Sequence, residues 1–131
     1  MSISERASDS TDFPGWLVQE FSAAGEFTAL VVLVDITDAT ITPLCSTYFN
    51  VVGAEVDWSD MVVMFAGSGA DWSGAAFFPV RASGGGPLDN PTARVQLRQL
   101  EMRLDEDRLV LNEGHFFDKW GRRMHVDEVP S

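Results

Sequence analysis

An uninterrupted apolar run, Ala-Leu-Val-Val-Leu-Val, lies within residues 26–36. Such a run, rich in β-branched residues, is typical of a central strand that is covered on both faces. Apolar residues are also frequent in 16–21, and the small residues 22–25 that follow predict a hairpin between two strands. Residues 44–52 predict a further strand, because Thr, Tyr, Phe and Val are favoured in sheets. Residues 35–43 either extend the strand before them or form a loop with a bend at Pro43.

The tripeptide Asp-Trp-Ser occurs twice, at 57–59 and at 71–73, and each copy precedes an apolar run. After the first copy, apolar residues recur at the spacing of three and four that defines one face of a helix. We predict a short buried helix that begins at a capping residue, Asp57 or Ser59, and ends at Gly67. The residues of its apolar face are Trp58, Met61, Val62 and Phe65.

The run after the second copy, residues 75–80, is short and aromatic, which predicts a strand that ends near Pro79. A glycine-rich loop over 82–87 separates it from a second helix. Asn90-Pro91 predicts the start of that helix, with Asn90 as the cap and Pro91 at the first helical position. The helix is amphipathic, since its apolar residues recur at spacings of four, three and four: Ala93, Leu97, Leu100 and Leu104.

Three short segments near the end of the chain, 108–111, 115–118 and 122–126, predict strands separated by turns. The whole pattern predicts a single α+β domain over 13–131, with a mostly antiparallel sheet of five or six strands. One amphipathic helix packs on a face of the sheet, and the short buried helix lies near an end. Residues 1–12, rich in Ser and Asp, predict a disordered tail.

Charge narrows the classes of partner. The 131-residue chain has 20 acidic and nine basic residues, a formal net charge of -11. The first 60 residues hold ten acidic residues and one arginine, a net charge of -9. This half of the chain repels nucleic acid phosphates and anionic membranes, and it attracts a basic partner. The simpler alternative is that the charge only keeps a small protein in solution.

Cysteine content and hydropathy predict the compartment. The chain has one cysteine, Cys45, which cannot form an intrachain disulfide and fits a reducing environment. No signal peptide or apolar run of transmembrane length is recognisable. We therefore predict a cytoplasmic protein. The mostly apolar sequence around Cys45 predicts a buried, inert thiol rather than a nucleophile.

The acidic residues around the two Asp-Trp-Ser copies form the predicted binding surface. Carboxylates beside an exposed aromatic ring pair with, and stack on, an Arg or Lys of a basic partner. Under the alternative, both tryptophans are core residues and the aspartates are helix caps or loop residues. The predicted binding residues are Asp35, Asp38, Glu55, Asp57, Asp60, Asp71 and Trp72, and Trp58 is the second candidate anchor.

The leading hypothesis is a non-enzymatic, intracellular protein that binds a basic protein partner. An immunity or inhibitor protein that blocks a nuclease-like toxin is one form, and a mimic of nucleic acid charge is the related one. We predict no catalytic residue, cofactor or metal. The alternative is an enzyme or a domain that binds a metal or small molecule beside the C-terminal hairpin, through His115, Asp118 and His125. A third hypothesis is a subunit that is stable only in an oligomer.

Overall fold

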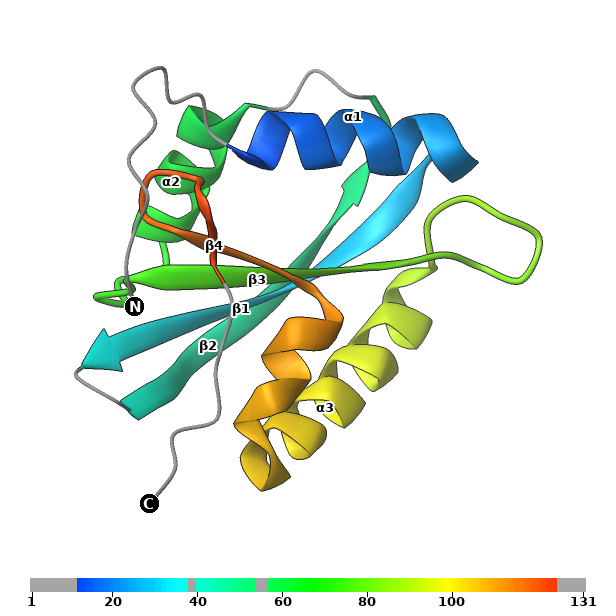
Figure 1. The fold of residues 1–131 in the computed structure, drawn as a ribbon. Helices are drawn as coiled ribbons and strands as arrows, with labels where there is room; N and C mark the ends of the chain where they lie inside the picture. Colours follow the sequence, from blue (N-terminus) through cyan, green and yellow to red (C-terminus); the bar gives the residue numbers. More distant parts are fainter. Residues whose placement is uncertain (1–11, 38–39, 54–56, 125–131) are drawn as a thin grey trace.

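A five-stranded antiparallel sheet lies between two layers of helix (Figure 1). The computed structural model describes residues 12–37, 40–53 and 57–124. The strand order is β2-β1-β3-β4-β5, so β2 and β5 form the edges. The elements are α1 (Asp12–Ala24), β1 (Phe27–Thr37), β2 (Thr40–Val51), α2 (Trp58–Ala66), β3 (Gly74–Val80), α3 (Asn90–Glu106), the 3-10 helix η1 (Arg108–Glu113), β4 (His115–Asp118) and β5 (Arg123–Met124). This arrangement confirms the predicted α+β class and the antiparallel sheet.

The apolar run of β1 is buried on both faces of the sheet, as predicted. Residues 27–34 are all buried, and β1 pairs with β2 on one side and β3 on the other. Leu30, for example, lies opposite Tyr48 of β2 and Phe78 of β3. Because successive side chains of a strand point to opposite faces, β1 supplies both hydrophobic cores of the protein.

The core between the sheet and helices α1 and α2 is aromatic. The ring centroid of Phe13 lies 5.1 Å from that of Trp58 and 5.2 Å from that of Phe77. Trp16 and Leu17 of α1 are buried in the same cluster. The core on the other face is mostly aliphatic, and α3 and η1 cover it (Figure 1). Its residues are Leu30, Val32, Val34, Ala76, Phe78, Leu100, Leu104, Val110, Leu111 and Phe116.

The predicted strand over 16–21 is wrong, and so is its hairpin with β1. These residues belong to helix α1, which buries Phe13, Trp16 and Leu17 on one face. Their spacing of three and one is compatible with a helical face, but aromatic and branched residues also favour strands. The helix ends at Ala24, where Gly25 has a φ of 79° that glycine adopts without strain.

Two further predictions near α3 need correction. Residues 108–111 are not a strand but part of η1, which Asp107 caps by accepting a hydrogen bond from the Leu109 amide at 3.0 Å. The cap of α3 is Asp89 rather than Asn90, and it accepts from the Thr92 amide at 2.9 Å. The predicted last strand is observed as β5, whereas residues 125–126 lie outside the described residues.

The other predicted elements are observed. β2 covers the predicted strand over 44–52 almost completely. Residues 35–37 continue β1 and residues 40–43 begin β2, whereas residues 38–39 lie outside the described residues. Helix α2 begins after the cap Asp57 and ends at Gly67. The prediction that α2 is a buried helix is wrong for its outer face, where Val63 and Met64 are exposed. Its inner face, with Trp58, Met61 and Phe65, is buried.

Candidate functional site

Asp57 and Asp60, two of the predicted binding residues, form a capping box at the start of α2. The Asp57 carboxylate accepts a hydrogen bond from the Asp60 amide at 3.0 Å and from the Ser59 hydroxyl at 2.8 Å. The Asp60 carboxylate accepts from the Asp57 amide at 3.4 Å. The Ser59 hydrogen bond, followed by that of the Asp60 amide, lowers the pKa of Asp57. Both carboxylates therefore satisfy first-turn amides, which is a structural role.

Both tryptophans of the repeated tripeptide are core residues. Trp58 and Trp72 are 8% and 7% exposed, and their ring centroids are 6.2 Å apart in the aromatic core. The indole Nε1 of Trp58 donates a hydrogen bond to the carbonyl oxygen of Lys119 at 2.7 Å. Neither ring presents a face on which a partner's side chain could stack. The alternative interpretation of the two tryptophans is the one that the structure shows.

Asp35 and Asp71 lie at the same end of the sheet, where β1 ends and β3 is about to begin. Ser73 joins these segments, because its amide donates to the Val34 carbonyl at 2.8 Å and its hydroxyl accepts from the Ile36 amide at 2.7 Å. Asp35 lies between the two β1 residues that Ser73 contacts, and Asp71 is two positions before Ser73. Asp71 is exposed and Asp35 is half-buried. We call Asp35 and Asp71 the acidic pair.

The two carboxylates of the acidic pair have no hydrogen bond or ion pair within residues 12–37, 40–53 and 57–124. The three ion pairs in this part of the chain are Arg81–Glu20, Arg103–Glu113 and Arg122–Asp118. None of them contains a predicted binding residue. Asp38 and Glu55, the remaining acidic members of the predicted site, lie outside the described residues.

The residues of the alternative site by the C-terminal hairpin have structural contacts. The Asp118 carboxylate accepts hydrogen bonds from the Trp120 and Arg122 amides and from Nε of Arg122, at 2.8, 3.0 and 2.9 Å. His115 is half-buried, and its Nδ1 lies 3.2 Å from Nη1 of Arg123. Burial, and then the charge of Arg123, lower the pKa of His115. His125 lies outside the described residues, which themselves contain no group of three His, Cys, Asp or Glu able to hold a metal.

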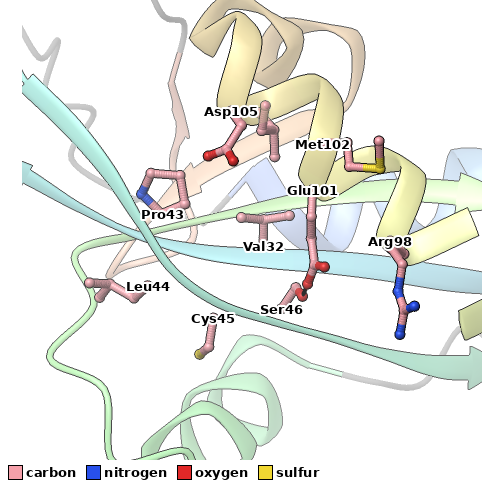
Figure 2. A pocket seen from close by; sticks show the side chains of 10 residues that line it. Val32, Pro43, Leu44, Cys45, Ser46, Arg98, Glu101, Met102 and Asp105 are labelled. Carbon is pink, nitrogen blue, oxygen red and sulfur yellow. Dashed lines mark hydrogen bonds between the residues drawn. The ribbon is translucent and has the colours of Figure 1, made fainter.

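A groove of about 340 Å³ between α3 and the edge strand β2 was not predicted from the sequence (Figure 2). Val32, Pro43 and Leu104 contribute apolar surface to it, and charged residues of α3 line its other wall. Ser46 points toward Glu101 and donates a hydrogen bond to its carboxylate across the groove (Figure 2). The sequence signal was the second stripe of α3, at helical spacing: Arg98, Glu101, Met102 and Asp105.

The prediction that Cys45 is buried is wrong. Cys45 is exposed on β2 and pairs with Leu33 of β1. The neighbouring apolar residues of β1 are buried because strands pair with β1 on both sides, whereas β2 is an edge strand. Periodicity within one strand does not show whether the strand lies in the middle of a sheet or at its edge.

Comparison of the chain with protein-family models, with curated proteins and with solved structures gave no match in any of the three. No helix among the described residues is long and apolar enough to cross a membrane.

Proposed function

We propose that the protein binds a basic protein partner and that the acidic pair, Asp35 and Asp71, is the centre of the binding surface. The observation that carries this proposal is the absence of any cation or hydrogen-bond donor at these two carboxylates within the described part of the chain. Asp57 and Asp60, by contrast, cap a helix. An unpaired surface carboxylate gains a charge-assisted hydrogen bond when a partner supplies Arg or Lys.

The net charge of -11 supports the same proposal through the rate of association. A strongly negative surface steers a positive partner into encounter and raises the association rate, and dissolved salt screens this effect. The buried tryptophans supply no aromatic anchor, so the interaction relies on the carboxylates. The concrete forms are an immunity or inhibitor protein that blocks a nuclease-like toxin, and a mimic of nucleic acid charge.

The proposal is tested by affinity capture from a lysate of the native cell, followed by kinetics with the purified partner. The wild-type chain should retain a basic protein, and the double variant Asp35→Asn/Asp71→Asn should lose it. The matched control is Glu26→Gln/Glu106→Gln, which removes the same two charges from residues that also have no partner in the described part of the chain. This control should retain the partner.

The association rate should fall steeply as salt rises, since the Debye length shortens from about 30 Å at 0.01 M to about 8 Å at 0.15 M. If added DNA displaces the partner, the protein is the mimic of nucleic acid charge. If the complex stays intact in the presence of DNA and the bound partner is an inhibited nuclease, the protein is the inhibitor form. The proposal is overturned if the wild-type chain retains no basic protein, or if both double variants bind equally.

A further inference from the structure

The outer edge of β2 is long and uncharged. The strand has 12 residues, Thr-Ile-Thr-Pro-Leu-Cys-Ser-Thr-Tyr-Phe-Asn-Val, and no strand among the described residues pairs with its outer side. Proteins usually protect such an edge with charges, proline, a bulge or short length. In β2, Pro43 and the irregular pairing next to Leu44 disturb only the first half. The stretch from Cys45 to Val51 keeps a regular register with β1.

Exposed apolar side chains lie beside this edge. Leu44 of β2 and Met102 of α3 line the groove and are 40% and 61% exposed. Val95 lies on α3 seven positions before Met102, which is the same helical face, and is 57% exposed. Scattered exposed apolar residues are common on protein surfaces, but exposed apolar residues that line a groove along an unpaired edge, as Leu44 and Met102 do, indicate an interaction surface.

A stripe of four charged residues runs along α3 beside Val95 and Met102, and its charges change sign along the helix. Arg94 and Arg98 lie in its first half, Glu101 and Asp105 in its second half, at the spacing of four, three and four that places all of them on one face. Neither arginine has an ion-pair partner among the described residues. Arg98, Glu101 and Asp105 line the groove next to β2 (Figure 2).

We propose that β2 pairs antiparallel with β2 of a second copy of this chain, around a two-fold axis perpendicular to the sheet. This symmetry joins the two sheets into one and places the two α3 helices side by side and antiparallel on the same face. The positive half of each α3 then faces the negative half of the other. The exposed side chains of Leu44, Val95 and Met102 lie along the junction and leave solvent.

The self-complementary pattern of α3 identifies a second copy as the occupant rather than a segment of a basic partner. A basic segment would meet Arg98 as well as Asp105, and the uncharged strand offers it no attraction. The net charge of -11 opposes dimer formation at long range, but physiological salt screens charges beyond about 8 Å. Neither residue of the acidic pair lines the groove. Asp35 points to the opposite face of the sheet, because its neighbours Val34 and Ile36 pack in the core beneath α3.

The mass of the full chain, measured by light scattering over a wide range of concentrations, tests this proposal. The wild-type chain should change from 14.4 kDa at low concentration to twice that mass at high concentration. In this arrangement Arg94 of one copy faces Asp105 of the other. Each of the single variants Arg94→Glu and Asp105→Arg should raise the dissociation constant roughly 10-fold or more, because each places like charges opposite one another. The double variant Arg94→Glu/Asp105→Arg exchanges the two facing charges and should restore the dimer.

Two comparisons separate this pairing from a general effect of charge or folding. Asp105→Arg lowers the net negative charge, so simple repulsion predicts a stronger dimer, whereas the proposed pairing predicts a weaker one. Lys119→Glu changes the charge as Arg94→Glu does, at the exposed β4–β5 turn, and should leave the dimer intact. Circular dichroism confirms that each variant folds, and rescue by the double variant excludes a folding defect.

Hydrogen exchange locates the interface. Amides between Cys45 and Val51 that face the outer edge should exchange more slowly as the dimer forms, because pairing protects them. A monomeric wild-type chain at every concentration overturns the proposal. So does a dimer that both single variants leave unchanged, or one that gives no added protection in β2. Variants of the acidic pair should not affect the mass, which keeps this test separate from that of the partner.

Discussion

Nη1 of Arg81 lies 2.7 Å from Oε2 of Glu20, in an ion pair that joins the segment after β3 to helix α1. Nη2 of the same guanidinium group donates to the carbonyl oxygens of Glu20 and Gly25, at 3.1 and 3.0 Å. Arg81 also lies over the ring of Phe27, 5.0 Å from its centroid. Arg81 thus binds two carbonyl groups near the C-terminal end of α1, where the helix dipole favours a cation.

We expect Arg81→Met to lower the free energy of unfolding by about 1–3 kcal/mol, because the partly buried Glu20 carboxylate and the two carbonyls lose their donor. Urea denaturation followed by circular dichroism measures this change. Arg94→Met is the matched control at concentrations where the chain is monomeric, since Arg94 is exposed and has no hydrogen bond or ion pair among the described residues. Equal stability of the two variants would show that the Arg81 contacts contribute nothing.

A second prediction concerns Gly114, which is required by close packing rather than by an unusual backbone angle. A Cβ atom at this position would lie 2.7 Å from the carbonyl oxygen of Phe77 and 2.8 Å from the ring of Phe78. The neighbouring backbone belongs to the β3–β4 pair, in which His115 lies opposite Phe77, so relief of the clash disturbs the sheet. We expect Gly114→Ala to cost roughly 1–3 kcal/mol of stability.

Gly84→Ala is the control for Gly114→Ala. A Cβ atom on Gly84 meets nothing within 4 Å. Alanine reduces the conformational entropy of the unfolded chain, so this variant should be unchanged or more stable by up to about 1 kcal/mol. Thermal and urea unfolding of the two variants provide the comparison. A Gly114→Ala variant as stable as wild type would mean that β3 and β4 are not packed this closely.

The third prediction is a pH dependence from His115. Burial and the charge of Arg123 lower its pKa below the ordinary 6.5, against a smaller opposing effect of Glu20. Between the folded pKa and about 6.5, the unfolded state binds more protons than the folded state. The contribution of neutral His115 to the free energy of unfolding is therefore fully present above about pH 6.5. It is lost as the pH falls from about 6.5 through the pKa of the folded state.

The free energy of unfolding should be measured between about pH 7.5 and about pH 5.5, where histidine titrates and most carboxylates do not. In a His125→Gln background, His115 is the one imidazole left in the chain. Stability should fall toward the acidic end in this background, and adding His115→Gln should flatten the curve. Parallel curves for the two chains would contradict the prediction.

Sequence patterns predicted those helices and strands whose pattern of apolar residues has one interpretation, whichever elements pack against them. The apolar run of β1 requires cover on both faces wherever its neighbours lie, and the amphipathic stripe of α3 requires one covered face. Helix α1 was missed because Trp16 and its aromatic neighbours suit a strand or a helix, and packing against Phe77 and Phe117 decides between them.

The candidate site was less predictable for a related reason. Sequence alone shows that Asp57 and Asp71 both precede tryptophan and serine. It does not show that the carboxylate of Asp57 caps a helix, whereas that of Asp71 has no partner in the described part of the chain.

The groove depends on the order of strands in the sheet, which places β2 at an edge beside α3. Strand order is a long-range property that local periodicity does not contain.

The fourth prediction concerns the thiol of Cys45. Because Cys45 is exposed on the edge strand, a water-soluble disulfide reagent should modify it in the native monomer, at dilutions where two copies do not pair through β2, at a rate comparable to that of the chain unfolded in guanidinium chloride. The control moves the thiol into the core with the double variant Cys45→Ser/Val34→Cys, since Val34 is 0% exposed. That thiol should react only as fast as the protein opens. Protection of Cys45 equal to that of the core thiol would show that β2 is covered on this face, and would contradict its exposure.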